Sequence, residues 1–139
     1  MSNQKTTELG ALALRIGLGT IFLAHSAYLK LVVFTLPGTA QYFASIGLPE
    51  ALAYAVFIME IAGGIALLAG TYTRLVALAL VPIALGATWA HFGAGWVFSN
   101  EGGGWEFPLF LALALIVQFL IGDGALAVRR SPDLKVAQN

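Results

Sequence analysis

The sequence predicts an all-α membrane protein, a four-transmembrane-helix bundle with both termini in the cytoplasm. Hydrophobic residues make up 59% of the 139 residues and charged residues only 10%, whereas a soluble domain carries about 25% charged residues. Four apolar segments also approach the length of about 20 residues that a helix needs to cross a bilayer. These segments lack the alternating pattern of barrel strands and are rich in Ala and Leu, which favours helices.

The four segments follow one another in a single membrane domain. The expected spans are residues 9–30, 50–70, 75–92 and 107–128, and the polar tails are residues 1–8 and 129–139. Proline and glycine fit the expected ends of these spans. Pro37 stops the first span and Gly70 closes the second. Pro108 lies in the first turn of the fourth span, where its missing N–H costs no hydrogen bond.

Basic residues flank the spans asymmetrically. Five of them lie in the tails and in the turn between the second and third spans, namely Lys5, Arg74, Arg129, Arg130 and Lys135. The other two loops hold only Lys30. Because Lys and Arg accumulate in cytoplasmic loops, we expect both termini and the 71–74 turn in the cytoplasm. Residues 37–49 and 93–106 are expected on the opposite side.

Small residues at helical spacing indicate which faces pack inward. The stripe in the first span is Gly10, Ala13, Gly17, Thr20, Ala24 and Ala27. The stripe in the second span is Ala53, Val56, Glu60, Gly63, Leu67 and Gly70. The third is Ala77, Leu80, Ala84, Ala87 and His91. We therefore expect Glu60 and His91 to face protein, because a charge that faces lipid is costly.

Glu60 and Arg15 are the candidate catalytic residues. Glu60 lies ten residues past Glu50, which is about 15 Å along its helix and near the middle of the bilayer. Arg15 is expected close to that depth, so an Arg15–Glu60 pair is one interpretation. The alternative is that Arg15 reaches the cytoplasmic head groups, because it lies about 200° from the small-residue stripe of its own helix.

A second group of side chains is expected at the membrane face opposite the termini. It consists of His25, Lys30, His91, Trp105 and Glu106. These are the candidate ligand-binding residues, and they suit the polar head group of a ligand inserted from the membrane. Histidine and glutamate exchange protons near neutral pH. The alternatives are an ordinary interface, where such residues are common, and a haem held by the two histidines, for which the chain gives no other sign.

Composition excludes several kinds of chemistry. The chain has no cysteine, which removes disulfides, thiol relays, iron–sulfur clusters and cysteine-based zinc sites. Its net charge of zero gives no reason to expect nucleic-acid binding. No nucleotide-binding loop or metal-binding motif is present. We therefore expect no metal and no covalently bound cofactor, and the chain would need a partner to carry electrons.

The sequence resembles the DoxX family over nearly its whole length, from Leu9 to about Val128. The motifs that carry the resemblance, in order, are Arg15, the segment HSAYLK at 25–30, QYFASIGLP at 41–49, Glu60 in MEIAGG, the turn at 70–74, His91, GGWE at 103–106 with Pro108, and GDGA at 122–125. The chain departs from the family at Ser26, where glycine is frequent. It also departs after residue 125, where an Asp that is frequent in the family is missing.

The resemblance implies a four-helix protein of the plasma membrane of a prokaryote, associated with quinone-linked or oxidative-stress redox chemistry. The expected function is that of an accessory or subunit of a quinone-linked membrane oxidoreductase, with a quinone as its ligand and membrane or soluble redox proteins as partners. A homo-oligomer is compatible with the sequence. The alternatives are a protein that binds or transports a lipid or small molecule without redox activity, and a membrane scaffold for partner enzymes.

Overall fold

The computed structural model describes residues 3–134, and all regular elements in this part of the chain are helices. Lys135, one of the residues behind the charge asymmetry, lies outside it, as do the last residues of the tail. The α-helices are α1 (Asn3–Leu23), α2 (Leu36–Ser45), α3 (Glu50–Ala69), α4 (Thr73–Ala90) and α5 (Glu106–Ile121). A π-helix, η1 (Ala24–Val33), continues α1 directly, and a short 3-10 turn, η2 (Phe92–Ala94), follows α4.

Within residues 3–134, three helical segments are long and apolar enough to cross a membrane, namely Asn3–Val33, α3 and α4. The fourth expected span, residues 107–128, extends beyond the helix that the structure has there, α5, which ends at Ile121. Helix α5 ends at Ile121 because Gly122 adopts a φ of 97°, and the residues that follow form an irregular segment. Its 16 residues give a length of about 24 Å, short of the ~30 Å hydrocarbon core, so the number of spans stays a prediction.

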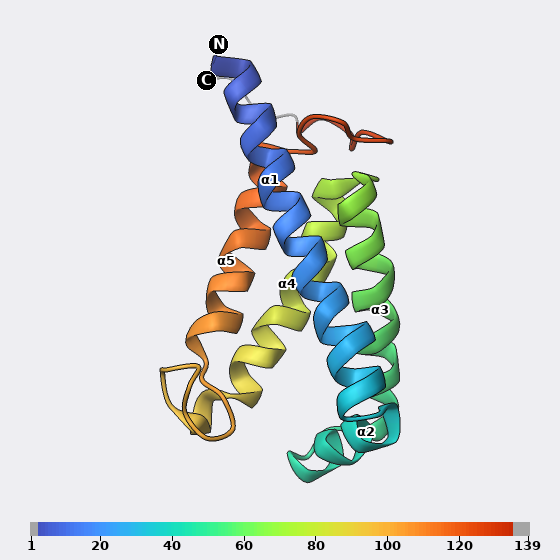
Figure 1. The fold of residues 1–139 in the computed structure, drawn as a ribbon, viewed down its shortest axis with the longest axis vertical. Helices are drawn as coiled ribbons and strands as arrows, with labels where there is room; N and C mark the ends of the chain where they lie inside the picture. Colours follow the sequence, from blue (N-terminus) through green and yellow to red (C-terminus); the bar gives the residue numbers. More distant parts are fainter. Residues whose placement is uncertain (1–2, 135–139) are drawn as a thin grey trace.

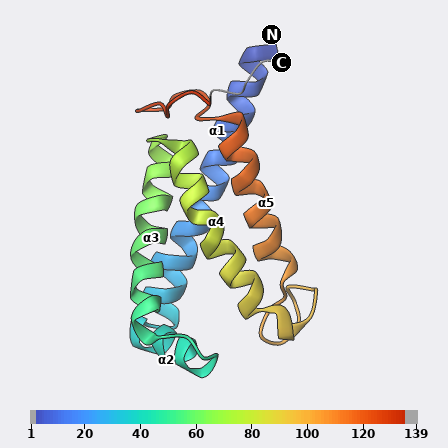
Figure 2. The ribbon, with the colours of Figure 1, turned by 180° about the vertical axis from the view of Figure 1, so that it is seen from behind.

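Helices α1, α3, α4 and α5 form a closed ring of neighbours. Helix α1 packs against α3 and α5, and α4 packs against α3 and α5. Figure 2 shows α4 between α3 and α5. The start of α1 and residues 122–134 lie together at what we call the terminal end, and α2 and residues 91–105 lie at the opposite, loop end (Figure 1). The backbone N–H of Ala125 donates to Glu8 O at 2.9 Å, which joins the first helix to the last segment.

The predicted inward stripe of the first span is wrong. All six of its residues are exposed, and nothing lies within 4 Å of a Cβ added at Gly10 or Gly17. The buried face of α1 is the opposite one, made of Ala11, Arg15, Leu18, Gly19 and Phe22. The stripes predicted for the second and third spans face inward, with Ala53, Gly63 and Leu67 buried on α3 and Ala77, Leu80 and Ala84 buried on α4.

Helix α2 was not expected, because the segment around it reads as a loop. It begins with Pro37 in its first turn, where proline is tolerated because no helical hydrogen bond is lost. The side chain of Thr35 accepts a hydrogen bond from Gly38 N at 3.2 Å and caps the helix. Helix α2 contacts both η1 and α3 at the loop end, so it lies beside the end of the α1–α3 pair.

Candidate functional site

A polar cluster joins η1 to α3 inside the bundle. Glu60 of α3 is 5% exposed and Ser26 of η1 is fully buried. The Ser26 hydroxyl donates to Glu60 Oε2 at 2.7 Å. Lys30 Nζ donates to the same oxygen and forms a salt bridge with it. This cluster of Ser26, Lys30 and Glu60 is called the polar site below.

Helix geometry explains why these three side chains meet. Ser26 and Lys30 are four residues apart, so they lie on nearly the same face of η1. The π-helical form of this segment is itself informative, because π-helical turns are frequent at functional positions. In any α-helix the Cα–Cβ bond leans toward the N-terminus, so Glu60 leans toward the loop end, where α3 begins. Lys30 leans in the opposite direction and meets it.

Both contacts to Glu60 are made by Oε2. Within residues 3–134 no side chain or backbone group donates to its other oxygen, Oε1. Glu60 therefore keeps one acceptor oxygen, and Lys30 keeps further ammonium hydrogens beside it, whereas the single hydroxyl hydrogen of Ser26 is donated to Oε2. Such a set can bind a small polar group that both accepts and donates hydrogen bonds.

The interpretation of an Arg15–Glu60 pair is wrong. Arg15 is buried, and it donates from Nη1 to Asp123 O at 2.9 Å and from Nη2 to Ala125 O at 3.1 Å. A Cβ added at Gly70 would overlap the Arg15 guanidinium, so Arg15 lies at the level of Gly70. That level is ten residues, about 15 Å, from Glu60 along α3. The alternative that Arg15 reaches the lipid head groups is also wrong, because its partners are backbone carbonyls of this chain.

Asp123 anchors the same segment to α4. Its carboxylate accepts from the backbone N–H of Thr73 at 2.9 Å, and from the N–H and hydroxyl of Ser131 at 2.9 and 2.8 Å. Burial acts to raise the pKa of Asp123, and the hydrogen bonds from Ser131 and Thr73 outweigh it, so the pKa lies below its ordinary value. Arg15 and Asp123 together fix the irregular segment that follows α5.

The five residues predicted as one ligand-binding group do not share one set of contacts. Lys30 belongs to the polar site. The other two basic side chains, His25 and His91, each hydrogen-bond through Nδ1 to a carbonyl of their own helix, Ile21 O at 2.9 Å and Ala87 O at 2.8 Å. The His25 ring also stacks on Phe107 with a centroid distance of 6.1 Å.

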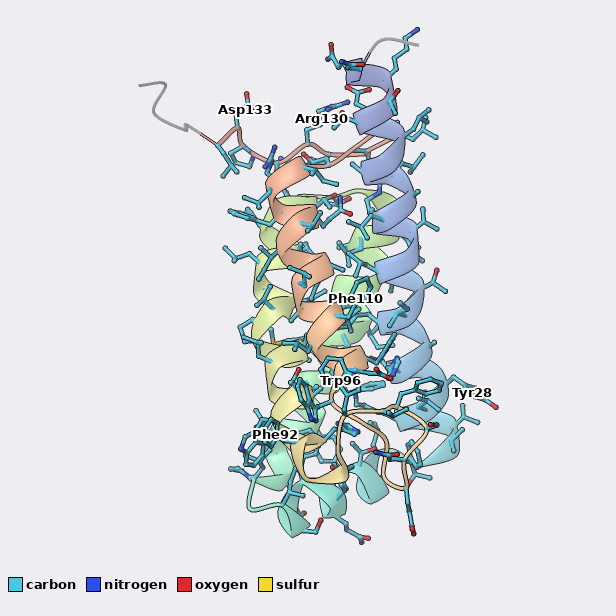
Figure 3. All side chains as sticks on the ribbon, turned by 90° about the vertical axis from the view of Figure 1, so that its left-hand side faces the viewer. Tyr28, Phe92, Trp96, Phe110, Arg130 and Asp133 are labelled. Carbon is cyan, nitrogen blue, oxygen red and sulfur yellow. The ribbon has the colours of Figure 1, made fainter. Side chains whose placement is uncertain are left out.

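Trp105 and Glu106 organise the loop before α5. The Trp105 ring stacks on Phe92 at 5.4 Å and meets Trp96 edge-on at 4.4 Å. Glu106 Oε1 accepts from Phe98 N at 3.0 Å. Figure 3 shows Phe92 and Trp96 at the loop end, far from Arg130 and Asp133 at the terminal end. These contacts give Trp105 and Glu106 a structural role, and a part for them in ligand binding stays a prediction.

Ser26 and Phe107 were missed as candidates in the sequence. Ser26 was noticed only as a departure from the family pattern, and nothing near it in the sequence indicates a partner 34 positions away. Phe107 reads as one more apolar residue of a span. The signal that was available is the charge on Lys30, because a lysine within a helix that enters a membrane needs an anionic partner.

Two hollows lie in the described part of the molecule. An apolar groove of about 720 Å³ runs along the outer side of α5, lined by residues such as Leu85, Trp96, Phe110 and Leu113 with Glu106 at its polar end. Figure 3 views this side, with Phe110 on the outer surface of α5. A cavity of about 510 Å³ at the terminal end is lined mainly by polar residues, among them Arg74, Asp123 and Arg130.

Comparison with known proteins identifies the family. Residues 10–93 match the DoxX family. A relative from Bacillus subtilis (strain 168), named "Putative oxidoreductase CatD", is 38% identical over 84 residues, which are 60% of this chain and 60% of that protein. No solved structure matches the chain. The family match includes the polar site and stops before α5. Because it covers more than half of the sequence, and the helices are those of a membrane protein, the chain belongs to the DoxX family.

Proposed function

We propose that this DoxX protein is an accessory or subunit of a quinone-linked membrane oxidoreductase. In this proposal its helices cross the plasma membrane of a prokaryote four times, and the polar site binds the quinone head group. The observation that carries the proposal is the Ser26–Lys30–Glu60 cluster, buried between two helices that are long and apolar enough to span a bilayer. The name of the Bacillus relative, an oxidoreductase, supports the redox part.

The side chains of the polar site fit a quinone head group. A quinone presents carbonyl oxygens that accept hydrogen bonds, and the Lys30 ammonium, which gives one hydrogen to Glu60, has further hydrogens to donate to one of them. Glu60 supplies an acceptor for the hydroxyl of the reduced form. An uncompensated carboxylate inside a bilayer is costly, so the Lys30 ammonium is what stabilises Glu60 as an anion in the absence of a ligand.

The reduction of a quinone takes two electrons and two protons. A partner protein would supply the electrons, because the chain has no cysteine or flavin motif of its own. Glu60 holds or releases a proton at its carboxylate, and Lys30 and Ser26 orient the group that exchanges it. The chain therefore contributes binding and proton transfer.

Binding of quinone analogues to the purified protein in nanodiscs tests this function. The probes are a short-chain ubiquinone and a short-chain menaquinone analogue. Glu60→Gln and Lys30→Met should each weaken binding about 10- to 150-fold, since the loss of a buried hydrogen bond to a charged group changes the free energy by about 1.5–3 kcal/mol. The matched control is Glu50→Gln, an exposed carboxylate at the start of α3, which should bind like the wild type.

Unchanged affinity in folded Glu60→Gln and Lys30→Met variants would overturn the proposal, as would the absence of binding by the wild-type protein. Thermal unfolding of each variant establishes that it is folded. Ser26→Ala is a milder variant, because it removes one hydrogen bond and no charge. It serves the same purpose if the charge variants do not fold.

A second candidate function is the binding of a non-redox amphiphile, and the apolar groove along α5 favours it. A groove of about 720 Å³ with Glu106 at one end suits an acyl chain with a polar head. Mass spectrometry of the lipids that copurify with the protein discriminates the two functions. Enrichment of a quinone supports the first, and enrichment of another amphiphile without quinone supports the second.

A further inference from the structure

We infer that the polar site opens only toward the loop end and is sealed from the terminal end. The inference rests on the same three residues as the proposed function, and it adds the membrane face with which they exchange protons. Three observations carry it: a dry layer on one side of the polar site, close helix contacts within that layer, and partial exposure of Lys30 on the other side.

The described part of the molecule holds two buried polar layers with an apolar layer between them. One polar layer contains Arg15 and Asp123 near Gly70, and the other is the polar site. They are separated by ten residues of α3, about 15 Å. The apolar side chains between them come from all four long helices and are at most 2% exposed: Leu18, Phe22, Leu67, Leu80 and Leu115.

The helices touch within this apolar layer. A Cβ added at Gly19 would lie 2.9 Å from Gly64 O, and one added at Gly64 would lie 3.1 Å from Gly19 O. On the other face of α3, a Cβ added at Gly63 would lie 2.9 Å from the nearest methyl carbon of Leu80. Helix α3 is therefore in close contact with α1 and with α4 at this depth. A buried water needs two or more polar partners, and the apolar side chains of this layer in the described part of the chain supply none.

The opposite side of the polar site is less closed. Lys30 lies four residues before Phe34, the C-cap of η1, so its backbone is about one turn from the loop end. Its side chain is 16% exposed, against 7% for that of Glu60. Lys30 is therefore the more exposed member of the ion pair, and its backbone lies on the side of Glu60 that faces the loop end. Tyr28, in the same π-helix, points outward at the loop end (Figure 3).

This arrangement gives the polar site one direction of proton exchange. A proton that Glu60 takes up or releases would come from the face at the loop end, because within residues 3–134 the buried side chains between the two polar layers are apolar. With the predicted topology, that face is the one opposite the cytoplasm. A quinone head group bound there would likewise be protonated from that face.

Cysteine labelling tests the inference directly, because the chain has no cysteine of its own. Lys30→Cys is made in right-side-out and inside-out membrane vesicles and treated with membrane-impermeant methanethiosulfonates. Two exposed positions report which face is which: Ser45→Cys at the end of α2 and Thr7→Cys at the start of α1. Lys30→Cys should react at least tenfold faster in the vesicles that label Ser45→Cys than in those that label Thr7→Cys.

The reagent charge gives a second readout. Removal of Lys30 leaves Glu60 unpaired, so the cationic trimethylammonium-ethyl reagent should react faster than the anionic sulfonatoethyl reagent. Ser26→Cys, which keeps the size of the side chain, replaces Lys30→Cys if that variant does not fold. Equal rates from both faces, faster labelling from the Thr7 face, or no labelling from either face would each overturn the inference. No quinone is needed, so failure of quinone binding and failure of one-sided access are separate results.

Discussion

The contact between α1 and α3 predicts a large difference between two similar substitutions in α1. In Gly19→Ala the new Cβ would lie 2.9 Å from Gly64 O and 2.9 Å from Leu68 Cγ. Both distances are below the ordinary van der Waals range, and one partner is backbone, so α1 and α3 must move apart. Overpacking of this kind costs about 1–3 kcal/mol. Gly17→Ala, two residues away on the exposed face, meets nothing within 4 Å.

Both substitutions gain the same helix propensity, about 0.8–1 kcal/mol. The difference between the free energies of unfolding of the two variants is therefore the cost of overpacking at residue 19. It should equal about 1–3 kcal/mol. At roughly 3 °C per kcal/mol for a chain of this size, Gly19→Ala should unfold about 3–9 °C below Gly17→Ala in detergent, measured by circular dichroism. Equal midpoints, or a more stable Gly19→Ala variant, would refute the close contact between the two helices.

Three further predictions concern the terminal end. Asp123→Asn should destabilise the protein at pH 7. Because the pKa of Asp123 is lowered by folding, the stability it provides is present above its unfolded value of about 3.9 and is lost as the pH falls through the folded pKa. The gap between the melting curves of the two proteins should therefore narrow as the pH falls below about 4 and close once the pH is below the folded pKa, and a pH-independent gap would contradict this assignment. Arg15→Gln should lower the free energy of unfolding by about 1.5–3 kcal/mol and make residues 122–134 more sensitive to limited proteolysis. Gln4→Ala is an exposed control. An unchanged cleavage rate would show that the hydrogen bonds of Arg15 do not hold this segment in place. A reporter fused to the C-terminal end should be active in the cytoplasm, and activity only on the far side of the membrane would reverse the predicted topology.

Much of the helical framework could be predicted from local sequence. The apolar lengths located α3 and α4 within a few residues, and the spacing of Ala53, Glu60 and Gly63 identified the buried face of α3 correctly. This succeeded because burial on a helix follows a local period.

The errors arose where the partner is distant in the sequence. On α1 the small residues repeat on the exposed face, and the buried face carries the charged Arg15, whose burial is costly without hydrogen-bond partners. Its cost is offset by carbonyls of Asp123 and Ala125, more than 100 positions later. The same holds for Ser26, whose partner is Glu60. Helical period does not reveal such pairs, so Lys30 was grouped by depth with residues that it does not contact.

The hydrogen bonds between Arg15 and the segment after α5 have a consequence for biogenesis. Arg15 enters the membrane with the first helix, and its acceptors are 108 and 110 residues further along the chain. At ribosomal rates of 5–20 residues per second, roughly 5–20 s of synthesis separate them. During that interval a guanidinium without its native acceptors sits in the nascent protein. A chain truncated before Asp123 would carry it permanently, which would mark the incomplete product as a substrate for membrane quality control.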